Sequence, residues 1–249
     1  MSLPSLNAGL LPTQMMILAP QGAEYQAIAK GLRGNQRRDQ ARFCLQPIPA
    51  GHDALLRCLD NLGKTWTETT QPQALLVMGV TGSLNPDLGI GQPVMVTTCG
   101  EWRSGNSPAP RQSDRDLSQT IATYLSRNFD VSIPLVKGIT VTQVISQASA
   151  KQTLAQQSGA DVVDMENVAI LQFAQQRQIP IAILRVVSDS VDHDLPNLDN
   201  IYDLHGNLKP WTLATRFLRR PVAALRLIQG SLMACQRLTQ LATILGKMP

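Results

Sequence analysis

The predicted fold rests on the stretch Ala160–Asp192, which reads ADVVDMENVAILQFAQQRQIPIAILRVVSDSVD. Its start, Asp161–Val163, predicts a short strand, and the amphipathic spacing that follows predicts a helix to about Arg177. A Gln-Ile-Pro turn then leads into the apolar run Ile181–Val187, which predicts a second, buried strand. A strand, a helix and a strand in this order indicate an α/β fold.

Two carboxylates stand where these strands end. Glu166 lies at the mouth of the helix, and Asp189 follows the second strand. Because open α/β sheets bind ligands at the carboxyl ends of their strands, the two residues predict a binding site. Each also has an ordinary explanation when taken alone. Asp189 fits a strand-end turn, and Glu166 fits an acid in the first turn of a helix.

The rest of the chain repeats the alternation of strands and helices. Further strands are predicted over Gln14–Ala19, Arg42–Pro47, Gln73–Val80, Pro93–Cys99 and Pro134–Thr142. Further helices are predicted from Glu24, over His52–Leu62, over Asp116–Phe129 and over Ser146–Ser158, with a loop over Glu101–Asp116. This pattern predicts a three-layer α/β/α sandwich around a central, twisted, mostly parallel mixed sheet.

The composition fits a folded domain in a reducing compartment. Of 249 residues, 43% are hydrophobic and 16% are charged, which supplies the apolar surface of a core. The four cysteines are dispersed, without a CxxC pair or a cluster with histidine, so we expect reduced thiols and neither a metal nor a cofactor. The chain start lacks the features of a signal peptide, and no apolar run reaches the ~18 residues of a membrane span. We therefore expect a cytoplasmic protein.

The end of the chain differs in charge from the rest. After Asp203 there is no acidic residue, whereas seven residues are basic. We divide the chain into a flexible segment (1–13), an α/β domain (14–205) and a basic, amphipathic, helical C-terminal extension (206–249). Pro221 separates two helical segments of this extension. The apolar stripe of the second segment consists of Leu225, Ile228, Leu232, Cys235, Leu238, Leu241 and Leu245.

Two explanations of this stripe stay open. A basic amphipathic helix without acids suits an anionic membrane surface, which would place the protein at the inner face of the membrane. Packing of the stripe on the domain or on a second copy of the chain is the other explanation. Nucleic acid is not expected as a partner, because no aromatic or basic readout motif accompanies the basic residues.

Three motifs occur in the order and spacing of a known family. They are GVTGSLNPDL (79–88), VDME (163–166) and LRVVSD (184–189). Glycines after a strand let main-chain amides approach a ligand closely, although such a turn alone is a weak signal. Together the motifs resemble the nucleoside phosphorylase/nucleosidase superfamily, which includes purine nucleoside phosphorylase and methylthioadenosine/S-adenosylhomocysteine nucleosidase. The resemblance covers roughly residues 15 to 192.

The resemblance implies roles for the residues of the second and third motifs. Glu166 would hydrogen-bond the ribose hydroxyls, and Met165 would pack against the sugar. Asp189 would be the general acid that protonates nitrogen 7 of a departing purine. Ser188 and Arg185 would hold this acid in place.

The resemblance also implies roles for the first strand and the glycine turn. Glu24 falls where the nucleosidases keep a carboxylate that activates water, although a carboxylate at a helix start is often only a partner of the helix dipole. The turn residues Gly79, Val80, Thr81 and Gly82 would position the substrate. Arg185 needs a buried partner inside its apolar strand, and Asp189 and Asp164 are the candidates.

The chemistry of N-glycosidic cleavage suits these residue types. The bond breaks through an oxocarbenium-like sugar while negative charge builds on the departing base. A positioned acid neutralises that charge, and such proton transfer contributes ~10²–10⁴-fold to the rate. Asp189 must therefore hold its proton near neutral pH, in a site that is shielded from water. Glu166 stays ionised on the sugar diol, and Glu24 takes a proton from the attacking water.

The sequence departs from the family pattern in several places. Asp164 is shorter than the usual acid before the methionine, and residues 142–146 lack the Ser-Gly-Asp and the base-stacking aromatic of the methylthioadenosine enzymes. There is also no convincing set of arginines for phosphate, which favours hydrolysis over phosphorolysis. The tail resembles the hopanoid-associated branch, which acts on adenosylhopane and releases adenine. This likeness rests on Leu195-Pro196, His205-Gly206 and Arg219-Arg220-Pro221.

We predict a purine nucleosidase that hydrolyses an adenosine-type nucleoside, with a 5′ substituent such as that of adenosylhopane. The alternatives are a phosphate-dependent nucleoside phosphorylase and a nucleoside-binding domain without turnover. The expected partners are a small-molecule nucleoside, phosphate only in the case of a phosphorylase, and further copies of the same chain, because sites formed between subunits are common in the resembling family.

Overall fold

The fold was analysed in a computed structural model, which describes residues 14–33, 42–103, 109–129, 131–196 and 217–248. The segment 1–13, the boundary at 205/206 and the first helical segment predicted for the C-terminal extension fall largely outside these ranges, as does His205-Gly206. The proposed division of the chain therefore stays a prediction.

The described strands form one eight-stranded mixed sheet. They are β1 (Met15–Pro20), β2 (Phe43–Ile48), β3 (Ala74–Ser83), β4 (Pro93–Glu101), β5 (Arg111–Gln112), β6 (Leu135–Thr140), β7 (Val162–Asp164) and β8 (Ile181–Asp189). Parallel pairs join β2 to β1, β1 to β3, β3 to β8, β4 to β6 and β6 to β7. Antiparallel pairs join β3 to β7, β4 to β5 and β4 to β8. The predicted mostly parallel mixed sheet is confirmed.

Part of the sheet closes into a ring, which the sequence did not indicate. Starting from β3, the pairing runs through β8, β4, β6 and β7 and returns to β3. β3 makes both contacts because its register shifts between Thr81 and Gly82, after which Gly82 and Ser83 pair with β7. The carboxyl ends of β7 and β8 therefore meet at this register shift, which we call the bend of β3, rather than lying along an open edge.

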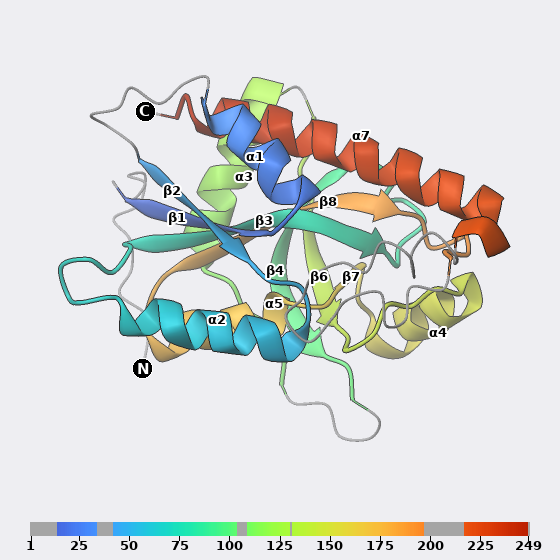
Figure 1. The fold of residues 1–249 in the computed structure, drawn as a ribbon, viewed down its shortest axis with the longest axis horizontal. Coiled ribbons are helices and arrows are strands. Elements are labelled where there is room, and N and C mark those ends of the chain that lie inside the picture. The colour runs from blue at the N-terminus through green and yellow to red at the C-terminus, as the bar shows by residue number, and fades with distance from the viewer. Residues whose placement is uncertain (1–13, 34–41, 104–108, 130, 197–216, 249) are drawn as a thin grey trace.

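Helices cover both faces of the sheet, as the three-layer prediction requires (Figure 1). The described helices are α1 (Ala23–Arg33), α2 (His52–Lys64), α3 (Arg115–Phe129), α4 (Ala148–Ser158), α5 (Asn167–Gln176) and α7 (Pro221–Leu245). On one face, α7 packs against α1 and α3, and on the other face α2 contacts α5. Two clusters of buried aliphatic side chains separate these helices from the sheet.

The loop predicted between β4 and α3 contains one further strand. β5 is only two residues long, and Arg111 and Gln112 pair antiparallel with Cys99 and Thr98. A polar two-residue strand has no apolar alternation, so its sequence gives no strand signal. The helix that follows begins at Arg115, one residue before the predicted start.

The two halves of α7 differ in how they are covered. Near its end, Leu238 and Leu241 are fully buried in the core that α1 and α3 share. Near its start, Leu225 and Leu232 are 56% and 59% exposed. Packing on the domain therefore explains the second half of the stripe and leaves the first half uncovered by described residues. None of the described helices has the length and apolar character needed to cross a membrane.

Candidate functional site

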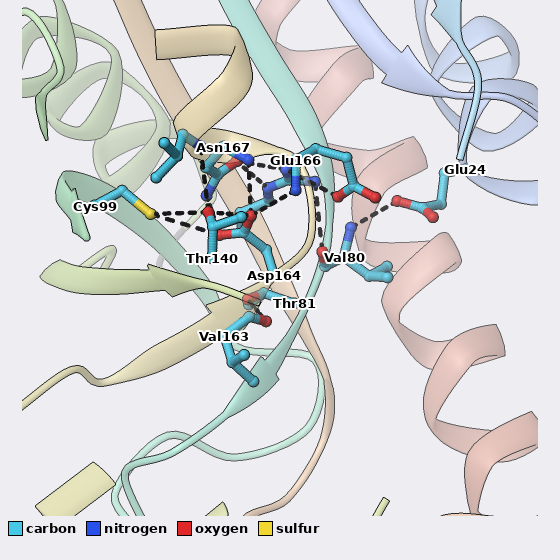
Figure 2. A network of polar contacts seen from close by, with 11 residues as sticks. Glu24, Val80, Thr81, Cys99, Thr140, Val163, Asp164, Glu166 and Asn167 are labelled. Atoms are coloured by element: carbon cyan, nitrogen blue, oxygen red, sulfur yellow. Dashed lines mark hydrogen bonds and ion pairs between the residues drawn. The ribbon is translucent and has the colours of Figure 1, made fainter. Parts of the chain in front are cut away.

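Glu24 lies against the bend of β3. It sits in the first turn of α1, and its Oε2 accepts a hydrogen bond from the backbone N–H of Val80 at 2.7 Å (Figure 2). A methyl group on Gly79 would lie 2.5 Å from Arg185 Nη1 and 2.6 Å from Glu24 Oε2. Glycine at this position therefore lets the carboxylate and the guanidinium converge on the main chain without displacing either side chain.

Arg185 of β8 is the cation at the centre of this group. Its side chain is fully buried, and it donates to Asn167 Oδ1 from Nε at 3.1 Å and from Nη2 at 2.5 Å. Nη1 donates to the Val80 carbonyl at 3.5 Å, and Nη2 lies 3.7 Å from Glu166 Oε2. The expectation that Asp189 or Asp164 pairs with Arg185 is wrong. The guanidinium instead pairs with Glu166 and donates to Asn167, the first residue of α5.

Asp164 fixes the start of α5 and with it the position of Glu166. Its Oδ1 accepts the backbone N–H groups of Glu166 at 2.8 Å and of Asn167 at 2.7 Å, as well as the Thr140 hydroxyl at 3.0 Å. Its Oδ2 accepts a hydrogen bond from Asn167 Nδ2 at 2.6 Å. This role of Asp164 was not predicted from the sequence. The available signal was an aspartate placed two and three residues before unpaired N–H groups of a helix start, where such side chains commonly cap.

Burial raises the proton affinity of both glutamates. The pKa of Glu24 rises from an ordinary 4.5 to about 7, chiefly because burial penalises its charged form, although Arg185 and the Val80 N–H act in the opposite direction. Burial likewise raises the pKa of Glu166, against the lowering effect of Arg185. Two carboxylates thus face a single guanidinium, so the group can take up a proton near neutral pH.

Asp189 belongs to a second polar group at the end of β8. Its Oδ1 accepts a hydrogen bond from the Ser188 hydroxyl at 2.6 Å. Its Oδ2 forms an ion pair with the ammonium of Lys151, which reaches across from α4. Lys151 Nζ also donates to the Ser190 carbonyl at 3.0 Å. Asp189 was expected to be shielded from water, and its side chain is only 13% exposed, but a buried cation is its neighbour.

The predicted residues Thr81 and Gly82 lie near the end of β3, and Met165 follows the end of β7. Thr81 donates its hydroxyl to the Val163 carbonyl at 2.8 Å, which ties β3 to β7. A methyl group on Gly82 would lie 3.0 Å from Asp189 Oδ2, so glycine leaves room for the acid. Met165 is half-buried and packs on a small apolar cluster that includes Val163.

A cavity of about 260 Å³ opens beside Asp189, between the end of β8 and α7. Its apolar lining comes mainly from Ile90, Leu195, Leu227 and Met233, and its polar lining includes Ser188, Asp189, His193, Asp194, Arg226 and Gln229. Within the described ranges, no three histidine, cysteine or acidic side chains are grouped so as to hold a metal ion. The carboxylates of Glu24, Glu166 and Asp189 at this end of the sheet are groups that can accept and donate protons.

Known proteins share this architecture. The 5′-methylthioadenosine/S-adenosylhomocysteine nucleosidase of Helicobacter pylori, with butyl-thio-DADMe-Immucillin-A, superposes with a TM-score of 0.69 at 13% identity, covering 96% of this chain and 100% of that one. The corresponding nucleosidase of Neisseria meningitidis, in complex with methylthio-immucillin-A, gives 0.65 at 14%, covering 95% and 100%. Futalosine hydrolase of Helicobacter pylori gives 0.64 at 15%, covering 95% and 99%. At these identities the likeness establishes the fold.

Sequence comparison establishes the family. No curated protein matches the chain. The sequence profile of the phosphorylase superfamily matches residues 55–205, which is more than half of the chain and includes the glycine turn, Glu166 and Asp189. The chain belongs to the phosphorylase superfamily.

Proposed function

We propose that the protein is a purine nucleosidase, which hydrolyses the N-glycosidic bond of an adenosine-type nucleoside. The observation that carries this proposal is Glu24, a carboxylate with a pKa of about 7 that lies beside Glu166 and Arg185 at the bend of β3. A general base is most effective when its pKa lies near the working pH, since it is then both ionised and basic enough to accept a proton.

The two polar groups divide the reaction between them. Glu24 takes a proton from water as the water oxygen attacks C1′ of the sugar, and Glu166 accepts hydrogen bonds from the ribose hydroxyls. The electrons of the breaking C1′–N bond move to the purine, and Asp189 delivers a proton to its nitrogen 7. Ser188 orients Asp189 through the 2.6 Å hydrogen bond to Oδ1.

The charges of the first group favour water over phosphate as the nucleophile. Phosphorolysis needs cations with donors that are free to bind the anion. Arg185 is engaged by Asn167, Glu166 and the Val80 carbonyl. Glu24 and Glu166, once ionised, would repel phosphate. These contacts support hydrolysis and leave the phosphorylase as the less favoured alternative.

The surroundings of Asp189 support an apolar 5′ substituent on the substrate. The apolar side chains that line the neighbouring cavity include Ile90, Leu227 and Met233, and the Helicobacter pylori and Neisseria meningitidis nucleosidases hold butyl-thio-DADMe-Immucillin-A and methylthio-immucillin-A. The uncovered leucines at the start of α7 lie on the same helix as part of this cavity. A lipid-linked nucleoside such as adenosylhopane fits both features, and the uncovered leucines would then contact the membrane that carries it.

The test is to measure adenine release from adenosine, from methylthioadenosine and from an adenosine with a long apolar 5′ group, each with and without phosphate. We expect release that does not depend on phosphate, increases with the apolar 5′ group and is abolished in Asp189→Asn. Release that requires phosphate would identify a phosphorylase. Binding of adenine or nucleoside without any release, unchanged in Asp189→Asn, would instead identify a nucleoside-binding domain.

A further inference from the structure

Lys151 is a buried lysine whose amino group reaches the candidate acid. Its side chain, on α4, is 1% exposed, and Nζ donates to Asp189 Oδ2 and to the Ser190 carbonyl. Both acceptors belong to the same turn at the end of β8. The buried side chain thus places an ammonium against Asp189.

Stability alone does not explain why the Lys151 ammonium is buried. Taking an ammonium and a carboxylate out of water costs free energy that their attraction often only balances, so a buried ion pair is weak evidence for a role in stability. Neutral packing between α4 and β8 would join the two elements without that cost. Placed at the residue that must protonate the purine, the pair instead offers a proton that is held one hydrogen bond away from the acid.

We propose that Lys151 is the positioning residue of the acid, which holds Asp189 and supplies the proton that Asp189 delivers. The proton on Lys151 Nζ moves to Asp189 Oδ2, which leaves an amine and a carboxylic acid with no change in the net charge of the pair. As the C1′–N bond breaks, Asp189 passes this proton to purine nitrogen 7. The proton that Glu24 takes from water then returns through solvent to the amine. This inference rests on the proposed nucleosidase function.

The test separates the supply of a proton from the rest of the reaction. Adenosine needs its base protonated, whereas 4-nitrophenyl β-D-riboside loses a phenolate that departs without a proton. In Lys151→Met we expect kcat for adenosine to fall by ~10²–10⁴-fold with little change in KM. We expect hydrolysis of the nitrophenyl riboside to stay within about threefold of wild type. Asp189→Asn should behave in the same way, and the double variant should lose no more than either single one, since residues that act as a unit are not additive.

Two further variants serve as controls for this test. Lys151→Gln keeps N–H donors for Asp189 and for the Ser190 carbonyl but has no proton to give, so it should lose adenosine hydrolysis. This variant tests the proposal even if Lys151→Met does not fold. Lys137→Met removes an exposed lysine of β6 and should leave both reactions unchanged.

The outcomes distinguish this inference from the proposed function. Equal losses on both substrates, or nearly wild-type adenosine hydrolysis in Lys151→Gln, would show a merely structural lysine and overturn the inference while leaving the nucleosidase intact. A wild-type protein that releases no base from any nucleoside would overturn both.

Discussion

The two acidic groups at the bend of β3 differ in how their charge is balanced. In the first group, the carboxylates of Glu24 and Glu166 face the guanidinium of Arg185. In the second, the carboxylate of Asp189 has the Lys151 ammonium directly against it. The first group is therefore short of positive charge and gains by taking up a proton. The second group is an ion pair with no net charge, and its ammonium already carries a proton that can be transferred.

This difference shows how one end of a sheet can supply both a base and an acid. All three residues carry the same functional group, and the environment sets their roles. Burial raises the pKa of Glu24 to about 7, which suits the acceptance of a proton. At Asp189, the proton for delivery is instead provided by the Lys151 ammonium that donates to Oδ2. Variants that change one group and not the other can test this division.

The largest effect is expected from removing the base. In Glu24→Gln the hydrogen bond from the Val80 N–H can still form, but the side chain can no longer take a proton from water. We expect kcat to fall by ~10²–10⁴-fold. Unlike the loss in Lys151→Met, this loss should affect adenosine and the nitrophenyl riboside alike, because both need activated water.

A matched control is available on the surface. Glu68→Gln makes the same chemical change at an exposed position after α2 and should leave kcat unchanged. A Glu24→Gln variant as active as Glu68→Gln would refute the assignment of the base, and would reduce Glu24 to a partner of the helix dipole.

A smaller effect is expected from separating Glu24 and Arg185. In Gly79→Ala the new methyl group would meet Arg185 Nη1 and Glu24 Oε2 within 2.6 Å, so both side chains must move. A displacement of about 1 Å can cost ~10²-fold in rate, and we expect kcat/KM to fall by roughly 10- to 100-fold. Gly89→Ala is the control, because a methyl group there meets nothing within 4 Å. Equal kinetics for the two variants would mean that the close approach at Gly79 has no functional consequence.

Much of the fold could be predicted because its signals are local. The apolar runs that became β1, β3 and β8 and the amphipathic spacing of α2 and α3 are periodic, and the structure confirms the elements within a few residues. The closure of β3, β8, β4, β6 and β7 into a ring could not be predicted in this way. It depends on a register shift between Thr81 and Gly82 and on a two-residue pairing with β7, and neither feature has a period in the sequence.

The residues of the candidate site also differ in whether they could be predicted from local sequence signals. Glu24, Glu166, Ser188 and Asp189 stand at the ends of predicted elements, where a sequence pattern can find them. Lys151 lies in a helix whose residues are mostly polar or small, so its pattern indicates a solvent-facing side chain. Its burial follows from the position of α4 over the end of β8. The partner of Arg185 was missed for a similar reason, since Asn167 is brought to it by the packing of α5 on the sheet.

The smallest of the expected rate effects is the dependence on pH, and its sign differs between activity and stability. Glu24 must be ionised to act as a base, so kcat/KM should fall by up to tenfold for each pH unit below about 7.

The stability of the fold should change with pH in the opposite direction. Because the pKa of Glu24 lies near 7 in the folded protein and near 4.5 ordinarily, the folded state binds more protons between these values, and the free energy of unfolding should decrease as pH rises through that window. The change is at most about 1.4 kcal/mol per pH unit. Urea denaturation of wild type and Glu24→Gln at pH 5 and pH 8 measures it. Parallel behaviour of the two proteins would mean that Glu24 ionises as it does in the unfolded chain, and the contrast with Asp189 would then lose its physical basis.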